Sequence, residues 1–222
     1  MNELLKRDLL KMPILILGFS LLSLGMILTK KAGLGMSSWG VLHQGVSLNT
    51  GISFGWVTLY LGMIILVLSV IFLKSKVGIG TIINALTIGF LLDMFDNLIT
   101  YTPSSNFSAG FMFLVGLLIM TFGRSLYIST KLGPGPRDGI FVGFSRITQI
   151  DVKYIKPAVE FTVLLIGYLL GLKADENLVG VGTIIATLFS GYLVQFYFKK
   201  LGFNPKIRNQ RNLRDYFVKN ES

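Results

Sequence analysis

Long runs of apolar residues, separated by short polar stretches, divide most of the chain into segments of roughly twenty residues. An α-helix of that length spans the hydrocarbon core of a bilayer, so each run predicts a membrane-crossing helix. The predicted crossings are 12–30, 54–73, 77–98, 108–129, 154–172 and 178–198. The pattern therefore predicts an all-α, polytopic membrane protein with six transmembrane helices.

Two further apolar segments, 36–48 and 134–146, are too short and too polar to cross a bilayer alone. Each follows the first crossing of one half of the chain and is preceded by a glycine-rich break. Irregular backbone at membrane depth is tolerated only where protein or water covers it. We expect two half-helices or re-entrant segments whose positive N-terminal ends face a polar cavity and favour anionic groups.

The residues at the start of these short segments support this interpretation. Ser37 and Gly135 stand at the expected N-cap positions, followed by Ser38 and Pro136 at the first helical position. The alternative is a pair of interfacial helices lying flat on the membrane, with Trp39 as a headgroup anchor. The sequence leaves both arrangements open.

A repeat relates the two halves of the chain. Residues 18–50 match residues 116–148 at an offset of 98, which becomes 102 in the last crossing of each half, where Val-Gly-x-Gly-Thr recurs. Three crossings per half is an odd number, so the halves are expected to have opposite orientations in the membrane. We predict one membrane domain over residues 1–222, built from inverted repeats. Its parts are repeat one at 12–98, repeat two at 108–200 and a basic cytosolic tail at 201–222.

The basic residues predict the orientation. With six crossings and both termini inside, all of the 21 lysines and arginines except Lys30, Lys31 and Lys173 lie on the cytoplasmic side. We therefore expect a multi-pass protein of the cell membrane with cytoplasmic N- and C-termini. The tail is expected to rest near anionic headgroups.

Composition excludes several classes of protein. Hydrophobic residues make up 52% of the chain and charged residues 14%, well below the share in soluble domains. With no cysteine and one histidine, neither a disulfide nor a metal site is expected, and no catalytic constellation or cofactor motif stands out. The net charge of +10 comes from basic residues in the loops and tail beside the membrane crossings, where such a bias is expected. The expected partners are therefore the lipid bilayer and a small solute rather than nucleic acid. Self-association is left open.

Polar residues inside the apolar segments are the candidates for substrate binding or ion coupling. Arg137 and Asp138 are the most distinctive pair, suited to binding a carboxylate, coupling protons or gating, or else to capping a helix. For Glu160 we expect Arg124 or Arg137 as partner, whether functional or structural. The candidate set is Ser37, Ser38, Trp39, His43, Gln44, Asn84, Gly135, Pro136, Arg137, Asp138 and Glu160. For Asn84 an inter-helix hydrogen bond is the competing interpretation, and for His43 a place at the membrane interface.

The strings Leu132–Gly139, Trp39–Gly45 and Gly78–Thr81 resemble the YczE/YyaS-type family of bacterial multi-pass membrane proteins. The resemblance covers most of the chain and is most specific in the Gly-Pro-Gly-Pro-Arg-Asp-Gly run. It implies an integral membrane location and no particular substrate. It further implies an aspartate in many members where Gly40 stands, opposite Asp138, so a coupling mechanism with two carboxylates is in doubt for this chain.

Together these patterns favour a small secondary transporter, not an enzyme, that moves a small solute, anionic in one reading, by alternating access. One alternative is the substrate-binding membrane subunit of an energy-coupling uptake system. Another is a non-transporting regulatory or anchoring membrane protein that acts through its basic tail.

Overall fold

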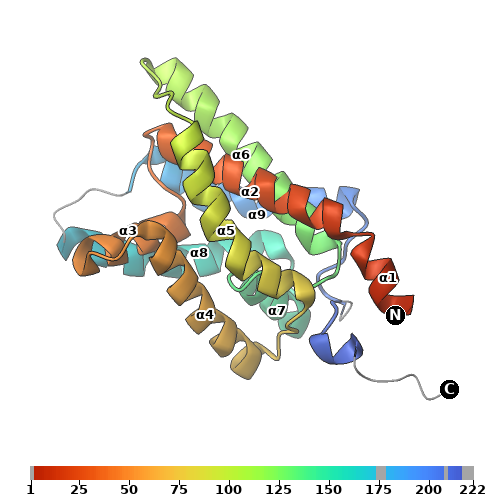
Figure 1. Cartoon of the computed structure of the whole chain (residues 1–222). Coiled ribbons are helices and arrows are strands. Elements are labelled where there is room, and N and C mark those ends of the chain that lie inside the picture. Colours follow the sequence, from red (N-terminus) through yellow and green to blue (C-terminus); the bar gives the residue numbers. More distant parts are fainter. Residues whose placement is uncertain (1–2, 174–178, 208–209, 217–222) are drawn as a thin grey trace.

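The computed structural model describes residues 3–173, 179–207 and 210–216, and within these ranges all regular structure is helical (Figure 1). The helices are α1 Glu3–Leu9, α2 Met12–Lys31, α3 Ser38–Thr50, α4 Phe54–Leu73, α5 Ile79–Leu98, α6 Asn106–Ser129, α7 Asp138–Thr148, α8 Val152–Lys173, α9 Val181–Lys200 and the 3₁₀ turn η1 Leu213–Tyr216.

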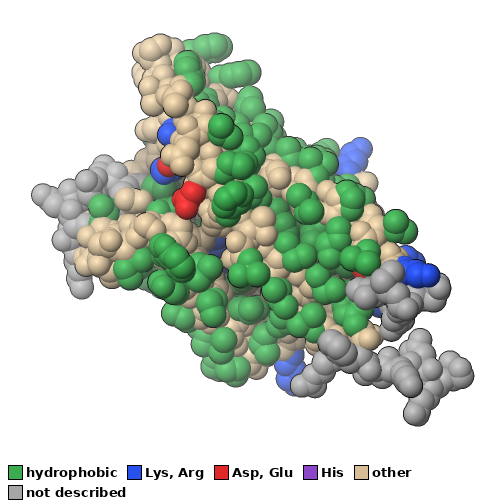
Figure 2. All heavy atoms as spheres, viewed as in Figure 1, with side chains coloured by type: hydrophobic (Ala, Val, Ile, Leu, Met, Phe, Trp, Pro, Cys, Tyr) green, Lys and Arg blue, Asp and Glu red, His purple; other side chains and the backbone are tan. Residues whose placement is uncertain are grey.

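Six of the described helices are long and apolar enough to cross a membrane: α2, α4, α5, α6, α8 and α9. Large apolar side chains point outward from them, as at Phe72 on α4 and Phe90 on α5, and hydrophobic atoms cover much of the face in Figure 2. Exposed apolar surface of this extent requires an apolar surrounding. The predicted all-α fold with six crossings is therefore confirmed.

Helices α2 and α6 form the centre of the structure and lie side by side (Figure 1). Glycines bring their backbones together at two points: Gly18 meets Gly123, and Gly25 meets Gly116. A Cβ at Gly123 would lie 2.5 Å from the Leu22 nitrogen, so the close approach requires glycine. The two contacts are equivalent under the offset of 98.

The glycine-rich loop that precedes each short helix contacts the other half of the chain. The Gly80 nitrogen at the start of α5 donates to the Leu132 carbonyl oxygen at 2.9 Å, and the Gly182 nitrogen at the start of α9 donates to the Leu34 oxygen at 2.7 Å. Each copy of the Val-Gly-x-Gly-Thr motif is thus hydrogen-bonded to the glycine-rich loop of the other half. Its glycines permit this contact, because a Cβ at Gly78 would overlap the backbone of Leu132.

The short helices α3 and α7 do not belong to the six crossings. Ser37 caps α3 as expected, accepting from the Gly40 nitrogen at 3.3 Å, and Ser38 is the first helical residue. For α7 the expected cap was wrong: Arg137 is the N-cap, Gly135 and Pro136 precede the helix, and no side chain caps it. A tight turn closed by the Gly139 nitrogen on the Gly135 carbonyl delays the start of α7.

The short helices α3 and α7 pack unequally against their neighbours, α8 and α4. Along α3, a Cβ at Gly45 would lie 3.0 Å from the Gly167 carbonyl of α8, and one at Gly167 would lie 2.6 Å from the Leu42 nitrogen. In the equivalent pair α4 and α7, a Cβ at Gly143, the counterpart of Gly45, would meet the Leu73 side chain of α4 at 3.1 Å rather than a backbone atom. The α3–α8 contact therefore brings backbones together and is the more extensive of the two contacts that the repeat relates.

The described part of the basic tail folds back onto the chain. Gln210 is buried between the Gly133 nitrogen, from which its Oε1 accepts at 3.1 Å, and the Ile128 carbonyl, to which its Nε2 donates at 3.2 Å. Tyr216 donates to Asp8 of α1 at 2.9 Å, and burial together with this bond raises the pKa of Tyr216. Helix α1 and the turn η1 therefore lie at the same end of the molecule (Figure 1).

Candidate functional site

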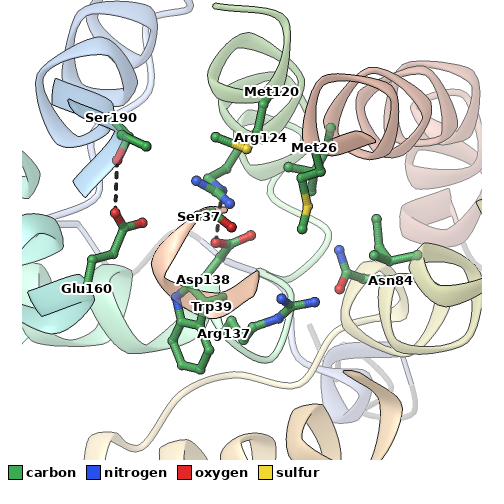
Figure 3. Close-up of a pocket in the computed structure, with 13 residues that line it drawn as sticks. Met26, Ser37, Trp39, Asn84, Met120, Arg124, Arg137, Asp138, Glu160 and Ser190 are labelled. Atoms are coloured by element: carbon green, nitrogen blue, oxygen red, sulfur yellow. Dashed lines mark hydrogen bonds and ion pairs between the residues drawn. The ribbon is translucent and has the colours of Figure 1, made fainter. Parts of the chain in front are cut away.

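A small cavity lies where α2, α5, α6 and α9 meet the starts of α3 and α7 and the middle of α8. Its volume of about 20 Å³ admits a water molecule but not a metabolite, so the site is closed in this structure. Its wall consists of Leu22, Met26, Ser37, Trp39, Asn84, Ile88, Met120, Arg124, Arg137, Asp138, Glu160, Ala186 and Ser190, of which Figure 3 labels ten.

The repeat organises this wall. Ten of its thirteen residues form five pairs at the repeat offsets: Leu22/Met120, Met26/Arg124, Trp39/Arg137, Asn84/Ala186 and Ile88/Ser190. Equivalent positions from the two halves therefore line the same cavity. The charged residues of the wall all come from the second half of the chain. The residues equivalent to Arg124 and Arg137 in the first half are the uncharged Met26 and Trp39. The cavity is thus symmetric in position and asymmetric in chemistry.

One ion pair in the wall joins α6 to α7. The Arg124 Nε lies 3.1 Å from the Asp138 Oδ1, and both side chains are buried (Figure 3). Tyr127, one turn further along α6, donates its hydroxyl to the Asp138 Oδ2 and accepts from the Gly135 nitrogen at 3.1 Å. These contacts hold the start of α7 against α6 and fix the Asp138 carboxylate at the cavity.

A second ion pair lies across the cavity and corrects an expectation. Glu160 of α8 pairs with neither Arg124 nor Arg137 but with Lys156, one turn earlier on the same helix. Ser190 of α9 donates to the Glu160 Oε2 at 3.1 Å and accepts from the Lys156 Nζ at 2.7 Å. A spacing of four places both side chains on one helix face, and Arg124 is already engaged by Asp138.

Arg137 has a different environment from these pairs. Its guanidinium lies 5.8 Å from the ring centroid of Trp39, a cation–π contact, and points toward Asn84 in Figure 3. Within the described part of the chain, its guanidinium forms neither an ion pair nor a hydrogen bond. Trp39 is only 8% exposed and lines the cavity, which argues against its expected alternative role as a headgroup anchor.

Six of the eleven candidates line the cavity: Ser37, Trp39, Asn84, Arg137, Asp138 and Glu160. The other five do not line it: Ser38, His43, Gln44, Gly135 and Pro136. Ser38 and Thr187 share a buried hydrogen bond of 2.8 Å, and the His43 Nδ1 lies 2.9 Å from the Thr58 hydroxyl. The role of all eleven in binding or coupling stays a prediction.

Sequence reasoning did not include Arg124, Met26, Met120 and Ser190 in the site. Arg124 was expected only as a partner of Glu160. The signal that would have found three of them is the repeat itself. Met26 and Arg124 are equivalent under the offset of 98, and Ser190 is equivalent to Ile88 under the offset of 102. A comparison of equivalent positions would have shown that the polar residues Arg124 and Ser190 of the second half replace apolar residues of the first half.

Comparison with known proteins finds bacterial relatives, one of which is described as a membrane protein. It is 31% identical over 194 residues to an uncharacterized protein of Haemophilus influenzae, covering 87% of this chain and 86% of the relative. It is 27% identical to the uncharacterized membrane protein YczE of Bacillus subtilis, with 81% of each chain covered, and 24% identical to the uncharacterized protein YyaS of the same organism, with 82% of this chain and 89% of the relative covered. No solved structure gives a significant match.

The predicted resemblance to YczE and YyaS is thereby confirmed, and it extends over most of the chain. Residues 9–199 match DUF6198, described as a family of unknown function. This range holds all six membrane-crossing helices from α2 to α9 and the entire cavity wall, apart from the final residue of α9. The chain therefore belongs to the DUF6198 family.

Proposed function

We propose that the chain is a small secondary transporter of the cell membrane, with both termini in the cytoplasm. Two inverted three-span repeats rock about the central cavity and expose it to one side of the membrane at a time. Transporters built in this way bind their solute near the bilayer midplane, at the interface of the repeats, beside interrupted helices. Here α3 and α7 are the short helices, and the solute is small.

The observation that carries the proposal is the composition of the cavity wall. Five pairs of residues related by the repeat line the cavity, so it lies at the interface of the two halves. A site in this position changes its exposure when the halves exchange conformations. A regulatory or anchoring protein has no need for such an arrangement.

The unequal packing of equivalent helices supports the same mechanism. The contact between α3 and α8 is close, whereas the equivalent contact between α7 and α4 is looser. In an inverted-repeat transporter the two halves differ in conformation, and exchanging their conformations produces the opposite state. We expect α3 to separate from α8 when α7 closes on α4.

The natural absence of cysteine allows a direct test of alternating access. Met26→Cys and Ala186→Cys each place one thiol in the cavity wall without removing a charged group. In oriented membranes, a membrane-impermeant thiol reagent is expected to modify both positions from either side. Leu86→Cys, on the apolar outer face of α5, serves as the unreactive control, and Lys131→Cys as the control that reacts from one side only.

Each result separates the proposal from its rivals. Modification of Met26→Cys and Ala186→Cys from one side only would contradict alternating access and favour a substrate-binding subunit of an uptake system. Protection of both positions from both sides, in protein that melts cooperatively, would favour the regulatory or anchoring role.

A further inference from the structure

The charges around the cavity do not cancel. Five charged side chains lie at or beside it: Arg124, Arg137, Asp138, Lys156 and Glu160. Asp138 neutralises Arg124, and Glu160 neutralises Lys156. The five groups therefore carry one excess positive charge, and Arg137 is the cation among them that forms neither an ion pair nor a hydrogen bond with a described residue. An excess charge at membrane depth is costly and marks the pathway of a substrate or ion.

A second polar group faces the same space. Asn84 of α5 is only 8% exposed, lines the cavity and forms no side-chain hydrogen bond to another described group. Buried amides normally find hydrogen-bond partners, so an unpaired one that faces a cavity is free to bind a water molecule or a solute there. Asn84 lies against Gly135, where a Cβ would be 2.6 Å from the Asn84 Oδ1, and its amide is directed toward the side on which Arg137 lies (Figure 3).

The remaining wall selects among anions. A guanidinium offers a planar fork of donors that matches a carboxylate in two parallel hydrogen bonds. One uncompensated positive charge balances a monoanion, whereas a dianion such as hydrogen phosphate would leave a net negative charge in the membrane. Leu22, Ile88 and Ala186 form an apolar part of the wall suited to a short hydrocarbon group.

We propose that the solute of this site is a short-chain monocarboxylate. That the bound molecule is transported rests on the proposed function, whereas the binding site is inferred from its own geometry. The carboxylate lies against the Arg137 guanidinium and accepts a further hydrogen bond from the Asn84 amide. The hydrocarbon group contacts the apolar wall, and the cavity widens beyond its present volume to admit it.

The two tryptophans of the chain provide a local probe for binding. Trp39 lies in the cavity wall against Arg137, whereas Trp56 is 58% exposed on α4. In Trp56→Phe protein, fluorescence reports from Trp39 alone. Titration with sodium acetate and sodium propionate at constant ionic strength is expected to change this fluorescence saturably. Acetamide, the neutral isostere of acetate, and methylammonium chloride are expected to cause no saturable change.

Substitutions of Arg137 test its role. Arg137→Gln is expected to weaken acetate binding about 100-fold, the usual consequence of removing one member of a buried charge pair. Arg137→Lys keeps the charge and loses the planar fork, so an intermediate affinity is expected, and this variant serves if Arg137→Gln fails to fold. Arg7→Gln makes the same substitution on the exposed part of the chain and is expected to bind normally.

Three results would overturn the inference: no saturable response to acetate or propionate in protein that melts cooperatively, an equal response to acetamide, or unchanged acetate affinity in folded Arg137→Gln. Uptake of labelled acetate into proteoliposomes separates the two proposals. Binding without uptake would leave the carboxylate site standing and contradict transport. Transport of a cation or neutral solute, unaffected by Arg137→Gln, would contradict the carboxylate site alone.

Discussion

The buried ion pair between Arg124 and Asp138 leads to a quantitative prediction about stability. Two unit charges 3.1 Å apart attract one another by about 5 kcal/mol at an effective dielectric constant of about 20. Removing Asp138 leaves Arg124 buried without its counter-charge, which costs about 3–5 kcal/mol, whereas removing Arg124 leaves Asp138 beside Arg137 in the same cavity wall. Asp138→Asn is therefore expected to lower the free energy of unfolding by about 3–5 kcal/mol, and Arg124→Met by a smaller amount.

The double variant is expected to recover much of this loss. It removes both charges together, and Met is the residue that the repeat places at the equivalent position Met26. The amide introduced by Asp138→Asn retains an oxygen that accepts from the Tyr127 hydroxyl. Replacing a buried ion pair with neutral groups is often nearly neutral for stability. Unfolding in mixed micelles by increasing dodecyl sulfate, followed by far-ultraviolet circular dichroism, gives all four free energies and the coupling energy between the two sites.

A second pair of variants supplies the matched control. Lys206 and Asp151 also form an ion pair, with Nζ and Oδ1 2.6 Å apart, but about a third of each side chain is exposed. An exposed pair contributes no more than about 1 kcal/mol. A coupling energy for Arg124→Met with Asp138→Asn no larger than that for Lys206→Met with Asp151→Asn would refute the argument that burial makes this pair strong.

Three further predictions concern packing and the loops. Gly123→Ala is expected to lower the melting temperature because its Cβ would meet the backbone of α2, whereas Gly110→Ala on the same helix meets no atom within 4 Å and is expected to be neutral; equal melting temperatures would contradict the close approach. Gln210→Ala is expected to increase hydrogen exchange at the Gly133 amide, which loses its acceptor, and unchanged exchange would show that the tail does not hold this loop. Thr81→Val removes a buried hydroxyl that donates at 2.8 Å to the glycine-rich loop and is expected to destabilise by about 1–3 kcal/mol in the micelle assay; a smaller loss would mean that this bond contributes little.

The helices of this protein were predictable from the sequence because bilayer thickness constrains them directly. A run of roughly twenty apolar residues has few alternatives to a crossing helix. The start of α3 was also predictable, since Ser37 supplies a local cap. The start of α7 was not, because a turn at Gly135 depends on contacts with Tyr127 near the end of α6 and with Asn84 of α5, which lies far from it in the sequence.

The partners of the charged residues required the tertiary structure. Glu160 is the exception, because its spacing of four from Lys156 on one helix already favours that pair in the sequence. Asp138 and Arg124 lie on different helices, and their distance depends on how α6 and α7 pack. Ion pairs are short-range interactions between long side chains, so a small change in helix position exchanges one partner for another.

The sequence by itself determined the membrane location, the six crossings, the matching glycines of the two halves and most of the polar groups that line the cavity. Each of these follows from residue type and spacing along one chain. Only the tertiary structure decided that Arg137 and Asn84 face a common cavity without an ion-pair or hydrogen-bond partner among the described residues, while His43 and Ser38 do not line it and bond to Thr58 and Thr187. The physical reason is that burial and pairing are properties of several helices at once, and only their packing fixes which side chains meet.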